Sequence, residues 1–389
     1  SMKFVRELFK PAWLEPRVWG DEGERQRTYF NEQKFNRMRK ARLKSFRSTP
    51  GVLARDITVF ERGRTEGGFG QFKNLFQRSK MMGEGSFGQV FDGTWKRESG
   101  NIDVVLKRSK DNVIGALEML QLELILNKEL SQRAPSVVSP FLGFVEVSEE
   151  EEGQIYDGFL STGLWLMWED LSARTLDTYI MESYGNNFPQ ELSQIYGGDE
   201  RVLQKLGTEL FKVLEVFHKE GLVHRDVKPE NLLVLKDGSI RLIDLGATAS
   251  CLRKPLSYEV GVGPQDPAYT SPTDGVLLPE GTDKPTTRNL PQLWEGNAPD
   301  RFDVYAAATV LLQLACPTVR EREGLIRFQE AMGKSGHDFS TVKQQLKLTS
   351  ATLDKNNGQG WDLLSKCFEK DRKKRPSSGD ALEHPFFLS

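Results

Sequence analysis

HRDVKPEN, residues 224–231, is the most distinctive segment of the sequence, and Asp244-Leu245-Gly246 begins thirteen residues after its last asparagine. Short strands are expected at 232–235 and 240–243, between the two motifs, because these segments are apolar. An aspartate at the end of such a strand, followed by a residue and then a glycine, lies at a turn where a cation can reach its carboxylate. The two motifs at this spacing govern the interpretation of the remaining chain.

The polar residues of these motifs are of the types that phosphoryl transfer to a hydroxyl requires. Asp226 would accept the proton of a substrate hydroxyl and orient it, and Lys228 would neutralise the charge on the transferred group. Asn231 and Asp244 would bind Mg²⁺ through side-chain oxygens.

The first two residues of the motif have other expected roles. We expect His224 to be structural, packed against the turn at Asp244. For Arg225 two partners are equally open, a phosphate on the loop that follows Asp244 or a nearby carboxylate.

A glycine-rich segment lies upstream between two strand-like stretches. It consists of Gly83, Glu84, Gly85, Ser86, Phe87 and Gly88. Glycine lets the backbone approach phosphate oxygens closely, so that N–H groups can point at them. The segment that follows is aromatic and alternating, which predicts a strand rather than a helix, so we expect a hairpin turn over a nucleotide, with Val90 packed on the adenine.

Lys107 ends the apolar run Val104-Val105-Leu106, 19 residues after Gly88. An inward-facing lysine needs a counter-charge, because an unpaired buried charge is costly. ATP phosphates and a carboxylate on the expected helix at 113–130 would supply it. That helix offers three candidates, Glu118, Glu123 and Glu129. The spacing of 16 residues favours Glu123, but Glu129 remains an alternative that spacing does not decide.

Composition limits the class of protein. The 53 Lys and Arg nearly balance the 55 Asp and Glu among 389 residues, so no nucleic-acid partner is expected. The three cysteines stand far apart and match neither a disulfide framework nor a zinc site. No apolar run approaches the roughly 20 residues that span a bilayer. We therefore expect a monomer, with any membrane attachment supplied by a segment outside this sequence.

The pattern along the chain predicts an α+β protein with two lobes. Residues 1–71 would be a basic extension, with a helix near 24–47 that packs on or flanks the rest. Residues 72–171 would form a small lobe around an antiparallel sheet, with strands at 141–147 and 164–169. Residues 172–389 would form a large helical lobe. Helices are expected at 173–182, 201–220, 301–315, 321–332, 359–368 and 377–383, with Gly/Pro-rich insertion loops at 185–200 and 261–299.

Taken together, residues 72–387 resemble a eukaryotic-type Ser/Thr protein kinase, since Lys228-Pro229-Glu230 is typical of the Ser/Thr class. The resemblance implies a two-lobed fold, Mg-ATP as donor and a hinge at 168–171. It implies an adenine pocket made by Val105, by backbone groups of Glu169 and Leu171, and by Leu233 as its floor, with Trp168 behind it. It also implies that Asp303 braces the catalytic loop.

A narrower resemblance links the chain to the state-transition kinases of chloroplast thylakoids. It rests on Asp244-Leu245-Gly246-Ala247, on LWEGNAPDRFDVYAAATVLLQLACPTVR at 293–320, on GWDLL at 360–364 and on ALEHPFF at 381–387. It implies a kinase on the stromal side of the thylakoid that phosphorylates light-harvesting chlorophyll-binding proteins. Members carry a membrane helix and a lumenal cysteine pair, and neither is present in this sequence, so redox sensing is not assigned to any residue.

Two departures from the family affect the expected substrate loop. The usual Ala-Pro-Glu reads Ser271-Pro272-Thr273, which removes the glutamate that would meet Arg375; either Glu280 substitutes or the segment is held differently. Asp266 stands where most Ser/Thr kinases have a threonine, and its carboxylate could bind Lys228 and alter peptide acceptance.

Three functions are compatible with these motifs: an active protein kinase, a nucleotide-binding pseudokinase or scaffold, and a small-molecule kinase. Scaffolds commonly lack one of Lys107, Asp226, Asn231 and Asp244, and all four are present. The helical pattern of 301–387 is typical of the large lobe of protein kinases. We therefore predict an active protein kinase.

Overall fold

The computed structural model describes residues 76–85, 87–96, 100–111, 113, 115–147, 163–185, 187–261 and 266–388. The predicted basic extension at 1–71, with its helix near 24–47, lies outside the described residues, as does Ser86. Within the described part of the chain, one compact unit ends at Ser172 and a second begins at Ala173.

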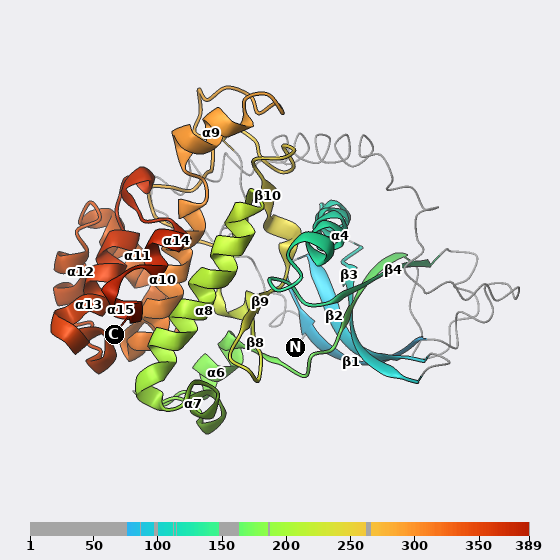
Figure 1. Cartoon of the computed structure of the whole chain (residues 1–389), viewed down its shortest axis with the longest axis horizontal. Coiled ribbons are helices and arrows are strands. Elements are labelled where there is room, and N and C mark those ends of the chain that lie inside the picture. The colour runs from blue at the N-terminus through green and yellow to red at the C-terminus, as the bar shows by residue number, and fades with distance from the viewer. Residues whose placement is uncertain are drawn as a thin grey trace, which may run out of the picture. The chain divides into compact units, whose positions relative to one another are not determined.

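The N-terminal unit is built on a five-stranded antiparallel sheet with the strand order β1-β2-β3-β5-β4 (Figure 1). One helix, α4, packs on strands β3, β4 and β5. The bounds are β1 Phe76–Glu84, β2 Gly88–Trp95, β3 Ile102–Ser109, α4 Ala116–Arg133, β4 Phe141–Val147 and β5 Gly163–Glu169.

Strand alternation gives this sheet two different faces. One face carries a core of Phe91, Trp95, Val104, Leu106, Trp165 and Met167. On the other face, Leu166 and Trp168 of β5 pack against Leu120 and Leu124 of α4. Because Val105 and Lys107 alternate with the residues of the first core and pair with Trp168 and Leu166, they belong to the face that α4 covers.

The C-terminal unit is mainly helical, with short strands that form a three-stranded sheet, β6-β8-β9, and a two-stranded pair, β10-β7. The strands are β6 Arg174–Thr175, β7 Leu222–Val223, β8 Leu232–Val234, β9 Ile240–Leu242 and β10 Ala249–Ser250. The helices are α6 Leu176–Glu182, α7 Gln190–Tyr196, α8 Asp199–Lys219, α9 Leu290–Asn297, α10 Arg301–Ala315, α11 Arg322–Lys334, α12 Phe339–Gln345, α13 Ala351–Cys367, α14 Ser378–Leu382 and α15 Pro385–Leu388.

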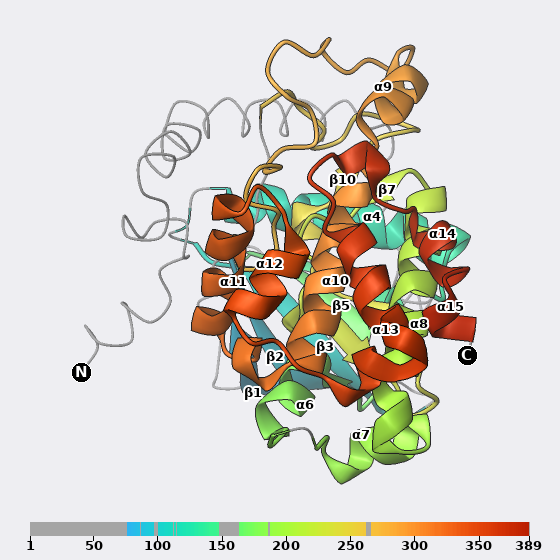
Figure 2. The same ribbon diagram turned by 90° about the vertical axis from the view of Figure 1, so that its left-hand side faces the viewer.

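Helix α10 is the centre of this unit. Every residue from Phe302 to Leu314 is buried, and the helix packs against α8 and α13 (Figure 2). A helix that is apolar around its whole circumference is one that other helices surround. Its first turn carries Asp303, a fully buried carboxylate, so the core helix also brings a charged group to the catalytic segment.

Several predicted boundaries differ from the structure. The helix expected at 113–130 begins at Ala116 and runs to Arg133. The expected loop at 185–200 contains α7, and the expected loop at 261–299 contains α9. The helix expected at 359–368 is the second part of α13, which has non-helical backbone at Lys355–Gly358. No helix within the described residues is long and apolar enough to cross a membrane.

Candidate active site

In the N-terminal unit, Lys107 and Glu123 form an ion pair, with 2.7 Å between Nζ and Oε2. The side chains are 14% and 3% exposed, respectively. They meet because α4 lies over the sheet face to which Lys107 belongs. Of the three glutamates considered from the sequence, the structure thus pairs Glu123 with the lysine.

The glycine-rich turn joins β1 to β2 and is closed by a hydrogen bond from the Gly85 N–H to the carbonyl of Gly88, at 2.9 Å. A Cβ atom at Gly88 would lie 3.0 Å from the carbonyl of Arg108 and 3.3 Å from Cε of Lys107. Glycine at 88 therefore lets the turn pass close to the lysine. Glu84 is held by an ion pair with Lys110 at 2.7 Å.

The residues predicted to form the adenine pocket are placed on their strands as follows. Val90 on β2 pairs with Lys107 on β3, and Val105 pairs with Trp168. The N–H of Glu169 donates to the carbonyl of Pro140. Leu233 is a half-buried residue of β8, in the other unit. Their contacts with a nucleotide stay predictions.

In the C-terminal unit, the catalytic segment is organised around the carboxylate of Asp226. Lys228 Nζ lies 2.8 Å from Asp226 Oδ2. Asn231 Nδ2 donates to the same oxygen at 2.9 Å and to the backbone carbonyl of Asp226 at 2.8 Å. A carboxylate held by a cation and an amide is fixed in direction, as proton acceptance from a hydroxyl requires.

Asp303 of α10 holds the backbone on which this segment is built. Its carboxylate accepts hydrogen bonds from the N–H groups of His224 at 2.7 Å and of Arg225 at 2.9 Å. Arg225 has a left-handed backbone, with φ 66, which is rare for a residue with a side chain. The buried carboxylate thus compensates a strained position, in the manner expected of a functional segment.

Asp244 also has a left-handed backbone, with φ 59, at the end of β9. The N–H of the preceding Ile243 donates to the carbonyl of Asn231 at 3.0 Å, and the His224 ring contacts the carbonyl of Ile243 at 3.2 Å. The two predicted metal residues therefore sit on segments that are bonded together, and His224 packs against the turn as expected.

The donor set fits Mg²⁺. Asn231 uses its Nδ2 in hydrogen bonds, and among the described residues no group donates a hydrogen bond to its Oδ1. Asp244 provides a carboxylate. Mg²⁺ prefers oxygen ligands of this kind, with phosphates and water completing the coordination. Within that same part of the chain, no group of three or more His, Cys, Asp or Glu side chains could hold a metal by itself.

The guanidinium of Arg225 faces the segment that follows Asp244. Nε donates to the carbonyl of Ala247 at 2.5 Å, and Nη2 donates to the Ser257 hydroxyl at 2.6 Å. Both partners in these hydrogen bonds are neutral oxygens, and the phosphate considered from the sequence stays a prediction.

Asp266 binds Arg322, the first residue of α11, rather than Lys228. The two Asp266–Arg322 hydrogen bonds are 2.9 and 3.1 Å long. Burial alone would raise the pKa of Asp266, but the hydrogen bonds from Arg322 and the charge of Lys228 hold it below its ordinary value. Burial would likewise lower the pKa of Lys228, but Asp226 and Asp266 raise it, so the amine stays protonated.

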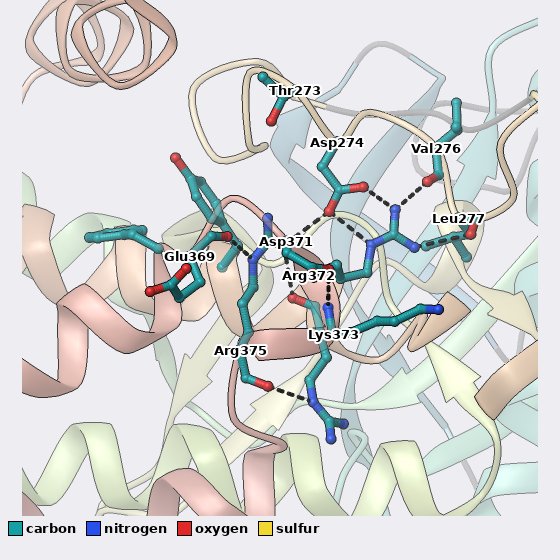
Figure 3. Close-up of polar contacts among 12 residues, drawn as sticks. Thr273, Asp274, Val276, Leu277, Glu369, Asp371, Arg372, Lys373 and Arg375 are labelled. Carbon is teal, nitrogen blue, oxygen red and sulfur yellow. Dashed lines mark hydrogen bonds and ion pairs between the residues drawn. The ribbon is translucent and has the colours of Figure 1, made fainter. Parts of the chain in front are cut away.

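The replacement for the missing glutamate is a residue that the sequence argument did not name. Asp274, one position beyond Thr273, accepts a hydrogen bond from Arg375 Nη1 at 3.0 Å and is also bound by Arg372 (Figure 3). Glu280, the candidate considered from the sequence, is exposed. The signal that could have found Asp274 is its position: it is the first carboxylate after the place where the family has one.

Comparisons with known proteins identify a matching family model and similar proteins. The model of the protein kinase domain matches residues 76–387. The chain is 33% identical over 358 residues to the serine/threonine-protein kinase STN8, chloroplastic, of Arabidopsis thaliana, covering 80% of this chain and 70% of that protein. It is 28% identical over 367 residues to STN7, chloroplastic, of the same plant, covering 87% of this chain and 62% of that protein, which is less than two thirds of its length.

A solved structure is similar as well. The crystal structure of a Stt7 homolog from Micromonas algae soaked with ATP aligns with a TM-score of 0.74 and 36% sequence identity, covering 81% of this chain and 93% of that chain. The two proteins are therefore similar both in fold and in amino-acid sequence.

Proposed function

Because the chain belongs to the protein kinase domain family and is an ATP-dependent serine/threonine protein kinase, we propose that it phosphorylates light-harvesting chlorophyll-binding proteins in photosynthetic state transitions. The place of action would be the stromal side of the chloroplast thylakoid membrane. The chloroplast kinases among its relatives support this location. The likeness to the Stt7 homolog supports the same subfamily.

The observation that best supports an active enzyme is the arrangement of side chains around Asp226. Its carboxylate is fixed by Lys228 and Asn231, which is the arrangement needed to orient a substrate hydroxyl for in-line attack. A module that only binds nucleotide does not need a carboxylate oriented by a lysine and an amide in this way. The alternative is therefore not favoured by any described contact.

The residues would divide the reaction as follows. ATP would supply the γ-phosphoryl group, and Mg²⁺, when bound, would supply positive charge to the phosphates. Lys107, oriented by Glu123, would bind the phosphates, and the turn at 83–88 would cover them. Asp226 would accept the hydroxyl proton, and Lys228 would stabilise the transferred group. Asn231 and Asp244 would hold the metal.

The test is transfer of labelled phosphate from Mg-ATP to isolated antenna complexes, compared with casein at equal concentration. We expect a clear preference for the antenna complexes. Equal rates on both would remove the support for the proposed substrate, while leaving the kinase activity itself intact.

A second arm tests the assigned chemistry. Asp226→Asn is expected to lower the rate by about 10²–10⁴-fold, the usual contribution of a positioned base, with ATP binding retained. Asp237→Asn is the matched control, because Asp237 is an exposed aspartate on the nearby turn between β8 and β9. An unchanged rate for Asp226→Asn would show that the assigned role is wrong.

A further inference from the structure

We propose that Arg372 is a positioning residue for the protein substrate, because it shares the carboxylate of Asp274 with Arg375 and thereby anchors the end of the segment 266–278, at residues 274–277. The inference rests on the proposed function, since a kinase receives its protein substrate on this segment. It adds a residue that lies outside every motif used above.

Arg372 and Arg375 both bind the carboxylate of Asp274, but Arg372 makes more hydrogen bonds to it (Figure 3). Arg372 binds both oxygens: Nε donates to Oδ2 at 2.8 Å, and Nη2 donates to Oδ1. Arg375 reaches only Oδ2, through Nη1. Its Nη2 is buried and has no hydrogen-bond partner within the part of the chain that the structure describes. The two-point contact, the stronger kind for an arginine and a carboxylate, is therefore made by Arg372.

The short side chain of Asp274 accounts for the different number of hydrogen bonds to the two arginines. A glutamate at position 273, where the family has one, could offer two oxygens to the terminal nitrogens of Arg375. Aspartate is one methylene shorter and stands one residue later, so it gives Arg375 a single oxygen. In this chain the two-point anchor of Asp274 is Arg372, and Arg375 adds a single hydrogen bond.

Arg372 also binds the backbone beyond Asp274. It donates to the carbonyl of Leu277 at 3.0 Å, to the carbonyl of Val276 and to the carbonyl of Asn297 at 3.4 Å. Leu277 in turn is buried in one cluster with Val223 and Ala249, which lie next to the catalytic segment and to the turn at Asp244. A single side chain thus ties the segment to the core beside the catalytic residues.

At neutral pH, Asp274 is ionised and forms ion pairs with Arg372 and Arg375. Burial alone would raise the pKa of Asp274, but the hydrogen bonds and charges of Arg372 and Arg375 hold it below its ordinary value. The planar fork of arginine makes several bonds at once, which a lysine cannot reproduce. Charge alone is therefore not sufficient at position 372.

The experiment compares Arg372→Gln and Arg372→Lys with Lys373→Ala, which removes an exposed positive charge from the same 3₁₀ turn. Steady-state kinetics with casein are measured together with the Kd for ATP. For both Arg372 variants we expect KM for casein to rise at least fivefold, with the Kd for ATP changed less than twofold. Lys373→Ala should match the parent. If kcat falls while KM is unchanged, the role of Arg372 is only structural and the inference is wrong.

A second measurement does not depend on activity. Amide hydrogen exchange of residues 274–278 should be at least tenfold faster in Arg372→Gln than in the parent and in Lys373→Ala. Unchanged exchange would overturn the inference even if the enzyme is inactive. Absence of phosphoryl transfer by the parent, with faster exchange in the variant, would instead count against the proposed function alone.

Discussion

Asp266 accepts two hydrogen bonds from the guanidinium of Arg322, one on each carboxylate oxygen. The same carboxylate lies near enough to Lys228 for each group to change the other's pKa. Arg322 therefore partly neutralises the charge of Asp266 and weakens its attraction for Lys228. This relationship leads to the first prediction.

Arg322→Ala should lower kcat about three- to tenfold, or about 0.7–1.4 kcal/mol in activation free energy. Without Arg322, Asp266 competes with Asp226 for Lys228, and the orientation of Asp226 is lost in part of the population. Adding Asp266→Thr, the residue that most Ser/Thr kinases have, should restore the rate. If the double variant is as slow as Arg322→Ala, competition for Lys228 is not the cause.

Glu123→Gln should lower kcat/KM for ATP by about ten- to a hundredfold, or about 1.4–2.7 kcal/mol. The change leaves the ammonium of Lys107 without its buried counter-charge, so the lysine loses its fixed direction. Glu129→Gln is the matched control, because Glu129 is exposed on the same helix. Equal losses in the two variants would contradict the assignment of Glu123.

The contribution of Asp274 to stability should depend on pH in the acid range. Its pKa in the folded protein lies below the ordinary 3.8, so ionisation stabilises the fold above that value, and the stabilisation is lost as pH falls through the folded pKa. The difference in Tm between the parent and Asp274→Asn should be constant from about pH 8 to 5 and should narrow below about pH 4. A difference that grows on acidification would contradict the ion pair.

The three cysteines should not react with thiol reagents in the folded protein. All are buried and free. Burial raises the pKa of Cys316 and Cys367 to about 12, and that of Cys251 well above its ordinary value, so little thiolate forms. Titration with a chromogenic disulfide should detect no thiol in native conditions and three in denaturant. Rapid labelling of the native protein would show that one of these sites opens.

The sequence predicted the elements whose pattern is local. The helix at 301–315 and the strand at 141–147 have the predicted bounds. Both segments are largely apolar, so their residue pattern favours one kind of secondary structure over their whole length. The kinase family and its two-lobed fold follow from HRDVKPEN and Asp244-Leu245-Gly246, and the family match confirms them.

Partners chosen by tertiary structure could not be predicted in the same way. Spacing left Glu123 and Glu129 open, because either could face the sheet until the rotation of α4 was known. The sequence left open whether Glu280 replaces the missing glutamate or the segment is held differently, and it did not name Asp274. The path of the chain after Thr273 decides which carboxylate reaches Arg375. The small helices α7, α9 and α12 were missed because seven or eight residues are too few to show a sustained helical pattern of apolar residues.

The ion pair of Lys107 with Glu123 is made within the N-terminal unit, and the bonds of Asp226 with Lys228 and Asn231 are made within the C-terminal unit. Each unit therefore holds its share of the chemistry in a fixed arrangement from its own residues. Ligand binding by either unit therefore restricts few further side-chain rotations, because ion pairs and hydrogen bonds already hold these residues.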